Sequence, residues 1–473
     1  MMSRADPGNL REAAEAIATG RISSLEMTTD ALDRAKQAQP RLNAFIAIEQ
    51  DAALEAATAA DAARARGLPL GVLHGVPLAH KDMFDRAGRI TGCGSKIRAD
   101  HVAGETSTVM QRLERAGALH IGRLNMSEFA MGPTGHNAHH GRAINPIDSA
   151  RITAGSSSGS GAAVGGGVVL AALGSDTGGS IRLPAACCGV VGIKPTQGRV
   201  SRHGAMPLSF SQDCIGPLAR SVEDAYLLLQ LISGADGLDP TCCDIPPPAA
   251  LTPEIGTLRV GIGGGLFSEA LSGEVATAME DMARLLRPAC RSVEPVQPPD
   301  FSAVAELANV VAMSEAGAVH FDALRSRPED FGPQVRMRLS QALAIPAPIY
   351  LRALQIRVIM LEEMLRTVFS ACDLLIVPAM PFLPPLASDV DVGAGAAMNS
   401  IVSAITAFTR AFSFLGLPVV TLPVARSREG LPVGLQIVAP PWQEQRAAAL
   451  ALHIEQALAL GPFTAGFARS EAA

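Results

Sequence analysis

The stretch at residues 154–198 constrains this chain most, because it alternates serine and glycine clusters with apolar runs. Its first cluster reads AGSSSGSG, its second reads GSDTGGS, and the segment at 162–173 between them is mainly apolar. We expect 162–173 to form a buried helix that spaces the two polar clusters rigidly. Glycines directly before a serine let backbone N–H groups converge on one point, which is how an oxyanion site is built without side chains. A flexible Gly/Ser linker would not enclose such apolar runs.

The composition is typical of a globular protein with a sizeable core. Of the 473 residues, 48% are hydrophobic, and the formal net charge of -6 offers no basic surface for nucleic acid or an anionic membrane. No apolar run reaches membrane-spanning length and the first residues lack a signal-peptide core, so we expect a cytoplasmic protein without a membrane partner. The eight cysteines include no CxxC pair. This pattern argues against a disulfide framework or a zinc site.

Five segments carry a pattern that extends over nearly the whole chain. They are GVPLAHKDMFDRAG from position 75, AGSSSGS from 154, GSDTGGSIRLPA from 174, CCGVVGIKPT from 187 and LPVGLQIVAPPWQE from 431. In this combination they resemble the signature of the amidase signature hydrolases. Ala154 and Ser158 stand where that pattern has glycines, and both residues are small enough to leave the loop feasible.

The resemblance implies an α/β fold in which a mixed, mainly parallel sheet lies between layers of helices (α/β/α). It also implies a single amidase domain over residues 1–473. Within it we expect a helical scaffold at 1–67, the signature core with the catalytic residues at 71–234, and the second half of the sheet at 257–473. The segment at 378–400 has little helical pattern, so it is a candidate lid.

A serine hydroxyl needs a base within hydrogen-bonding reach before it can attack a carbonyl. The resemblance assigns the nucleophile to Ser180, the bridging hydroxyl to Ser156 and the base to Lys81. It also predicts a cis peptide bond between Gly155 and Ser156. Lys81 must be neutral to act as a base, and lowering its pKa from about 10.4 toward 7 corresponds to roughly 4 to 5 kcal/mol of burial and local field. The apolar residues before Lys81 favour such burial.

Other residues of the signature are expected to support the reaction. The backbone N–H groups that the resemblance assigns to the oxyanion belong to Thr177, Gly178, Gly179 and Ser180. The Met131 carbonyl is expected beside the bound amide. An acid and an arginine can fix a loop through paired hydrogen bonds. The residues expected to hold the loop from behind are Ser157, Asp176 and Arg182.

Two other functions stay open at the level of sequence. Residues 155–159 fit G-x-S-x-G, the nucleophile elbow of α/β-hydrolases, which would make Ser157 the nucleophile of an esterase. However, no apolar strand precedes this motif and no later histidine lies in an obvious catalytic loop. The second alternative is the glutaminase subunit of a tRNA-dependent amidotransferase. Relatives of that kind carry an acid before the segment matching FSFLGLP, whereas residues 401–410 have none, although Arg338 is available for a carboxylate.

The segments expected around the pocket contribute mainly apolar side chains, which are Phe129, Met131, Met206, Phe210, Met380 and Phe382. They predict an apolar pocket for a small neutral aryl or alkyl amide, ester or carbamate. The expected activity is hydrolysis through an acyl-enzyme, without a cofactor. The HNAHH segment at 136–140 has metal-like spacing, but no second ligand cluster matches it, so no metal site is expected. The resemblance leaves a homodimer open.

Overall fold

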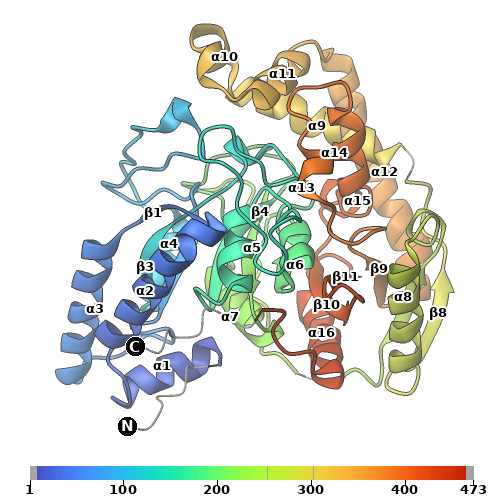
Figure 1. Ribbon diagram of the computed structural model, residues 1–473. Helices are drawn as coiled ribbons and strands as arrows, with labels where there is room; N and C mark the ends of the chain where they lie inside the picture. The colour runs from blue at the N-terminus through green and yellow to red at the C-terminus, as the bar shows by residue number, and fades with distance from the viewer. Residues whose placement is uncertain (1–7, 253, 302, 465–473) are drawn as a thin grey trace.

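The computed structural model describes residues 8–252, 254–301 and 303–464 (Figure 1). The chain opens with helices that carry one short strand between them. These elements are α1 (Leu10–Ala18), α2 (Ser24–Leu42), β1 (Phe45–Ile48) and α3 (Gln50–Ala65). Ser23 begins α2 with a capping box, because its side chain accepts from the Glu26 N–H while Glu26 accepts from the Ser23 N–H.

A small sheet carries the lysine of the signature. Its strands lie in the order β1-β3-β2, where β2 is Pro77–Lys81 and β3 is Leu119–Leu124. β2 and β3 run parallel, and the crossover between them contains α4 (Thr108–Arg115). The Leu173 N–H donates to His80 Nδ1 at 3.0 Å, which ties β2 to the larger sheet. Lys81 therefore ends its strand at the junction of the two sheets.

The larger sheet contains eight strands in the order β4-β6-β5-β10-β11-β9-β7-β8. Its first part comes from α5 (Ser158–Gly165), β4 (Ala171–Asp176), α6 (Arg182–Cys188), β5 (Val191–Lys194), β6 (Cys214–Ala219) and α7 (Val222–Ile232). Its second part uses β7 (Arg259–Gly263), β8 (Ser292–Val296), β9 (Leu374–Pro378), β10 (Val419–Arg426) and β11 (Pro432–Val438). α6 contacts β5, β10 and β11, while α16 (Glu444–Leu458) contacts β10 and β11 and α7 contacts β5 and β6. Figure 1 shows strands β10 and β11 between α6 and α16.

The sheet is mixed, as predicted, but the expectation of mainly parallel pairing is wrong. Within the eight-stranded sheet only β7 pairs in parallel, with β8 and β9, whereas the other neighbouring strands described in that sheet are antiparallel. The strand β9 illustrates the cause, because every one of its residues is buried although it pairs antiparallel with β11. Helices on both faces make a strand continuously apolar whatever its direction, so sequence alone does not reveal the direction.

The predicted helix at 162–173 is only partly correct. α5 ends at Gly165, and residues 171–173 already belong to β4. The run Gly165-Gly166-Gly167 lies between the two elements, and Gly167 adopts a φ of +72°, which ends the helix. The two polar clusters are thus joined by a short helix followed by a strand.

The later half adds most of the remaining helices. These are α8 (Gly273–Leu286), α9 (Val304–Val319), α10 (Phe321–Ser326), α11 (Pro333–Ala342), α12 (Ala347–Ala371), α13 (Ala387–Val390), α14 (Met398–Thr406) and α15 (Arg410–Phe414). The candidate lid at 378–400 contains α13 and the start of α14, and Met380 and Met398 are buried. Its role as a lid stays a prediction. By length and composition, no described helix could cross a membrane alone, and only α11 and α12, bent by 91°, pass that test as a pair.

Candidate active site

Lys81 ends β2 inside a ring of serine hydroxyls. Its side chain is 2% exposed, and Nζ lies 2.7 Å from Ser156 Oγ, 2.9 Å from Ser175 Oγ and 3.2 Å from Ser157 Oγ. A neutral amine has two N–H donors and one lone pair, so it can accept from one of three hydroxyls and donate to the others. The shortest contact, to Ser156, is the one along which a proton would most readily pass.

Burial lowers the pKa of Lys81 to about 7, because the charged form loses its hydration. Asp213 opposes this shift most, followed by Asp176 and Cys93. No carboxylate lies within ion-pairing distance of Lys81 among the described residues. A substantial fraction of this lysine is therefore neutral at physiological pH, which a general base requires.

The loop before Ser156 has a special backbone. The Gly155–Ser156 peptide bond is cis, as predicted, and Ala154 adopts a φ of +55°. The Gly155 N–H donates to Pro133 O at 2.7 Å, and the Ser127 N–H donates to Ser156 O at 3.1 Å. A Cβ at Gly155 would meet Gly132 O at 2.4 Å, so only glycine fits at that position. These contacts hold Ser156 against Lys81.

The loop at 176–182 is fixed by a buried ion pair. Arg182 donates from Nε and Nη2 to the two oxygens of Asp176, both at 3.0 Å, and both side chains are fully buried. Burial alone would raise the pKa of Asp176, but the charge and hydrogen bonds of Arg182 hold it well below its usual range. Arg182 also donates to Thr409 O, Gln436 Oε1 and Ser413 Oγ. The pair therefore ties the loop to later parts of the chain.

The Asp176 carboxylate accepts a hydrogen bond from one of the N–H groups that were expected to bind the oxyanion. The Gly179 N–H donates to Asp176 Oδ1 at 2.7 Å, whereas the Gly178 and Ser180 N–H groups find no acceptor among the described residues. Gly179 has a φ of +132°, and a Cβ there would meet Thr409 Oγ1 at 2.5 Å. Of the four N–H groups expected at the oxyanion, those of Thr177, Gly178 and Ser180 are without an acceptor among the described residues, and Gly179 shapes the turn.

Ser180 opens into a small cavity, which distinguishes it from Ser156 and Ser157. It is 9% exposed, while Ser156 and Ser157 are fully buried. The Ser157 N–H donates to Ser180 O at 3.3 Å, and no hydrogen bond joins the Ser156 and Ser180 hydroxyls in the described part of the chain. The cavity measures about 60 Å³ as space for the centres of water-sized spheres, so it suits a small substrate. Met131 lines it with Thr177 and Gly178, and the role predicted for the Met131 carbonyl beside a bound amide stays a prediction.

Two arginines line the same cavity. Arg338, from α11, is 9% exposed, and Arg410, at the start of α15, is 8% exposed. Among the described residues, the only hydrogen-bond partner of Arg338 is Met313 Sδ at 3.7 Å, and that of Arg410 is Ala305 O at 3.5 Å. Neither forms an ion pair with a described carboxylate.

The pKa of both arginines is lowered to about 10, mainly by burial, and in Arg338 the charge of Arg410 contributes to this shift. For Arg410, Glu306 acts in the opposite direction. Buried cations without partners are costly, so the cavity is electrostatically prepared for an anion.

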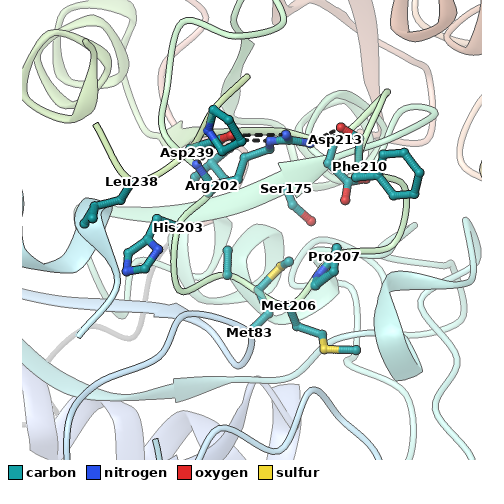
Figure 2. A pocket seen from close by; sticks show the side chains of 13 residues that line it. Met83, Ser175, Arg202, His203, Met206, Pro207, Phe210, Asp213, Leu238 and Asp239 are labelled. Carbon is teal, nitrogen blue, oxygen red and sulfur yellow. Dashed lines mark hydrogen bonds and ion pairs between the residues drawn. The ribbon is translucent and has the colours of Figure 1, made fainter. Parts of the chain in front are cut away.

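Most of the apolar residues predicted around the pocket lie elsewhere, although other apolar side chains, among them Leu183, Leu208 and Val402, line the cavity beside the two arginines. Of the six apolar residues expected there, only Met131 lines the cavity at Ser180. Met206 and Phe210 line a separate cavity together with Ser175 and Asp213 (Figure 2). The remaining residues lie elsewhere: Phe129 packs against His320 and Phe331, Met380 is in the core, and Phe382 borders a surface groove. Loop composition did not reveal which side chains turn toward the nucleophile.

Several residues at the site were not singled out from the sequence. Ser175 lies inside the signature, so its contact with Lys81 was within reach of the motif. Arg410 gave a different signal, because it is the lone charge in the apolar run from 401 to 418. A single arginine in such a run indicates a buried cation with a specific task. Asp213 gave no signal beyond its place before an apolar strand.

The HNAHH histidines lie outside this cavity. His139 Nε2 lies 2.9 Å from Glu128 Oε1, and His136 Nε2 lies 3.7 Å from Asp391 Oδ2. Across residues 8–252, 254–301 and 303–464, no group of three or more His, Cys, Asp or Glu side chains is arranged to hold a metal ion.

A comparison with protein families identifies the architecture that carries this site. The profile described as Amidase matches residues 26–447. The chain belongs to the amidase family. This confirms the resemblance to the amidase signature hydrolases, and it establishes the chain as an amide hydrolase with the α/β fold of that family. The esterase alternative based on an α/β-hydrolase elbow has no support from this family.

Among curated proteins, AtzE of Pseudomonas sp. (strain ADP), which is named as one subunit of 1-carboxybiuret hydrolase, is 40% identical over 438 residues, covering 92% of this chain and 95% of that protein. The A-type subunit of glutamyl-tRNA(Gln) amidotransferase from Moorella thermoacetica is 38% identical over 461 residues, covering 92% of this chain and 93% of that protein. Both names describe parts of larger enzymes. The family thus includes members of larger complexes.

Solved structures agree over nearly the full length. A chain from an inhibitor-bound vestigial protein complex, described as revealing the evolutionary origins of an s-triazine catabolic enzyme, superposes with a TM-score of 0.89 at 37% identity, covering 96% of this chain and all of that chain. The native peptide amidase of Stenotrophomonas maltophilia superposes with a TM-score of 0.82 at 29% identity, covering 95% and 97% of the two chains.

Proposed function

We propose that this amidase hydrolyses a C–N bond in a small amide that carries a carboxylate, and not the neutral aryl or alkyl amide suggested by the sequence. The observation that carries the proposal is the pair Arg338 and Arg410, buried without ion-pair partners among the described residues in the cavity that holds Ser180. A carboxylate bound there would receive charge-assisted hydrogen bonds and would remove the cost of two unpaired cations. The carboxylate would thereby hold the scissile amide near Ser180.

In the proposed reaction, Ser180 Oγ attacks the amide carbonyl while its proton passes to Ser156, whose own proton passes to Lys81 Nζ. The oxyanion that forms is held by the Gly178 and Ser180 N–H groups. Lys81 then returns a proton through Ser156 to the leaving nitrogen, the C–N bond breaks, and an acyl-enzyme on Ser180 remains. Water hydrolyses this ester by the same proton path, which releases the acid and restores Ser180.

The chemistry of a relative supports an acidic substrate. The name of the Pseudomonas protein states that its complex hydrolyses 1-carboxybiuret, which combines a carboxyl group with urea-type C–N bonds. Small acidic amides or carboxylated ureas are therefore the first classes to assay. The small cavity favours them over extended peptides or acyl chains.

The test compares monoamides of short dicarboxylic acids with the corresponding diamides. We expect kcat/KM to be at least about tenfold higher for the acids, since a charge-assisted contact contributes about 1.5 to 3 kcal/mol. Arg338→Met should raise KM for the acid by about 10- to 100-fold while changing the diamide little. Arg142→Met, in a neighbouring cavity, is the matched control. A wild-type enzyme that prefers the diamide would refute the acidic-substrate proposal.

The glutaminase component of an amidotransferase is a second candidate, because proteins of that name are 36–38% identical over most of the chain. Arg338 would suit the carboxylate of glutamine. However, Val402, Thr406 and Arg410 present no acid to the cavity, and no described Asp or Glu lines it. The α-ammonium group of glutamine would then face Arg410 without a counter-charge. Turnover of glutamine with higher kcat/KM than a non-amino monoamide would favour this candidate.

A further inference from the structure

Asp213 is a buried acid directly behind the loop that carries Ser180. It is 7% exposed and immediately precedes β6, whose first residue, Cys214, is paired with Asp176 at the end of β4. Thr177 Oγ1 donates to Asp213 Oδ1 at 2.5 Å. The N–H groups of Leu208 and Ser209 donate to Oδ2, each at 2.9 Å. Asp213 therefore anchors the first residue after β4, where the chain turns toward the nucleophile.

The same acid reaches the lysine through a shared cavity. Asp213 and Ser175 line one cavity of about 210 Å³, again as space for the centres of water-sized spheres (Figure 2). Ser175 Oγ is a hydrogen-bond partner of Lys81 Nζ at 2.9 Å. This cavity lies on the Ser175 side of the lysine, whereas the Arg338 cavity lies on the Ser180 side. Asp213 is thus placed to act on Lys81 from the side opposite the cavity at Ser180.

The charges around Asp213 leave it free to influence Lys81. Arg202 lines the cavity but forms its ion pair with Asp239 at 3.1 Å. Asp213 makes no ion pair within the described residues. Asp176, the other carboxylate near the lysine, is neutralised by Arg182.

The titration of these groups agrees with that arrangement. Burial raises the pKa of Asp213 to about 6, and hydrogen bonds from Thr177, Ser209 and Leu208 and the charge of Arg202 oppose the rise. Of the charged groups that raise the pKa of Lys81, Asp213 acts most strongly, ahead of Asp176 and Cys93. An ionised Asp213 therefore favours the protonated form of the lysine.

We propose that Asp213 is a positioning residue that fixes the oxyanion loop through Thr177 and, by its negative charge, sets the pH range in which Lys81 accepts a proton. This inference rests on the proposed function, since it requires Lys81 to be the base. Its two parts are separable, because the hydrogen bond runs through Thr177 and the charge effect does not.

The test uses variants that remove one part at a time. Asp213→Asn removes the charge and keeps an acceptor for Thr177, so the rising limb of the pH profile of kcat/KM should move to lower pH by about half a unit or more. Thr177→Val removes the hydrogen bond and keeps the charge, so kcat should fall by about tenfold with the limb unmoved. Thr177→Ser, which restores the hydroxyl, should recover most of this loss. Asp224→Asn removes a buried carboxylate on α7 that accepts from the Leu10 N–H, away from Lys81, and should change neither quantity.

A second readout separates this inference from the proposed function. The rate at which a fluorophosphonate labels Ser180 is measured against pH in the wild type and in each variant. A wild type without a rising limb near neutral pH would refute Lys81 as the base. A wild-type limb that stays in place in Asp213→Asn would refute only the role of Asp213. An equal shift in Asp224→Asn would also overturn it, because the effect would then be general to buried acids of this chain. If Asp213→Asn fails to fold, equal kcat in Thr177→Val and Thr177→Ser would still contradict the positioning role.

Discussion

The molecule buries arginines in two different ways within one site. Arg182 has a full set of partners, with Asp176, Gln436 and Ser413 among them, and it binds three segments of the chain together. Arg338 and Arg410 are almost as buried, yet their only hydrogen-bond partners among the described residues are a thioether sulfur and one distant carbonyl. The first arrangement stabilises the fold. The second leaves binding capacity unused by the protein, which is what a ligand site requires.

The largest expected effect tests whether hydrolysis takes place in the cavity that the unpaired arginines line. Ser180→Ala should lower kcat by about 10⁴-fold or more, since it removes the proposed nucleophile. The folded state should be unchanged, because no hydrogen bond of the Ser180 hydroxyl supports the described structure. The measurement is turnover of a monoamide acid together with calorimetric unfolding. Ser158→Ala, at a buried serine away from Lys81, is the control, and comparable losses in both would contradict the assignment.

The next largest effect comes from breaking the ion pair between Arg182 and Asp176. Arg182→Met leaves Asp176 buried without a cation, which costs about 3 to 5 kcal/mol. We expect the melting temperature to fall by about 5 °C for a chain of this length, and activity to fall with it as the loop loosens. A double variant, Arg182→Met with Asp176→Leu, should regain part of the stability because no buried charge remains. An unchanged melting temperature in the single variant would show that the pair is not structural.

The pH dependence of activity extends the comparison to Lys81, the fourth buried basic residue of the site. The proposed base must be neutral, and burial brings the pKa of Lys81 to about 7. Activity should therefore rise about tenfold per pH unit below 7 and level off above it. The profile of kcat/KM on a substrate whose carboxylate stays ionised throughout this range reports the lysine of the free enzyme. A flat profile between pH 5 and 8 would contradict its role as base.

The smallest expected effect is a change in stability, and its sign is opposite to that expected for Arg182→Met. Replacing an unpaired buried cation with an apolar side chain is often neutral or stabilising, so Arg410→Met should raise the unfolding free energy by about 1 kcal/mol. The same variant should lose the thermal stabilisation that a monoamide acid gives to the wild type. Calorimetry with and without the acid measures both. A clear destabilisation of the ligand-free variant would place Arg410 with Arg182 as a structural residue.

The contrast also explains what the sequence could and could not predict. Ser156, Ser157, Asp176 and Ser180 lie within 25 positions of one another, and Lys81 lies in a second block of the family pattern, so motifs were enough to expect them together. The cis bond at Gly155–Ser156 followed from the same resemblance.

The substrate pocket depends on long-range packing instead. Arg338 and Arg410 come from α11 and α15, and only the placement of these helices over the loop at 176–182 brings their side chains beside Ser180. No local spacing encodes that meeting. For the same reason the direction of the strands was misjudged, because β10 pairs with β5, which lies more than 200 positions earlier.

The proposed catalytic residues and the proposed substrate-selecting residues lie in separate stretches of the chain. This separation has an evolutionary consequence. The residues proposed to carry out hydrolysis come from before residue 220, whereas the arginines proposed to select the substrate come from after residue 330. Lineages that descend from one ancestral hydrolase can therefore acquire new substrate specificities by substitutions at a few helical positions, such as 338, 406 and 410, while the inherited catalytic residues stay unchanged. Chimeras that exchange residues 330–415 between relatives should exchange their substrate preference in the same way.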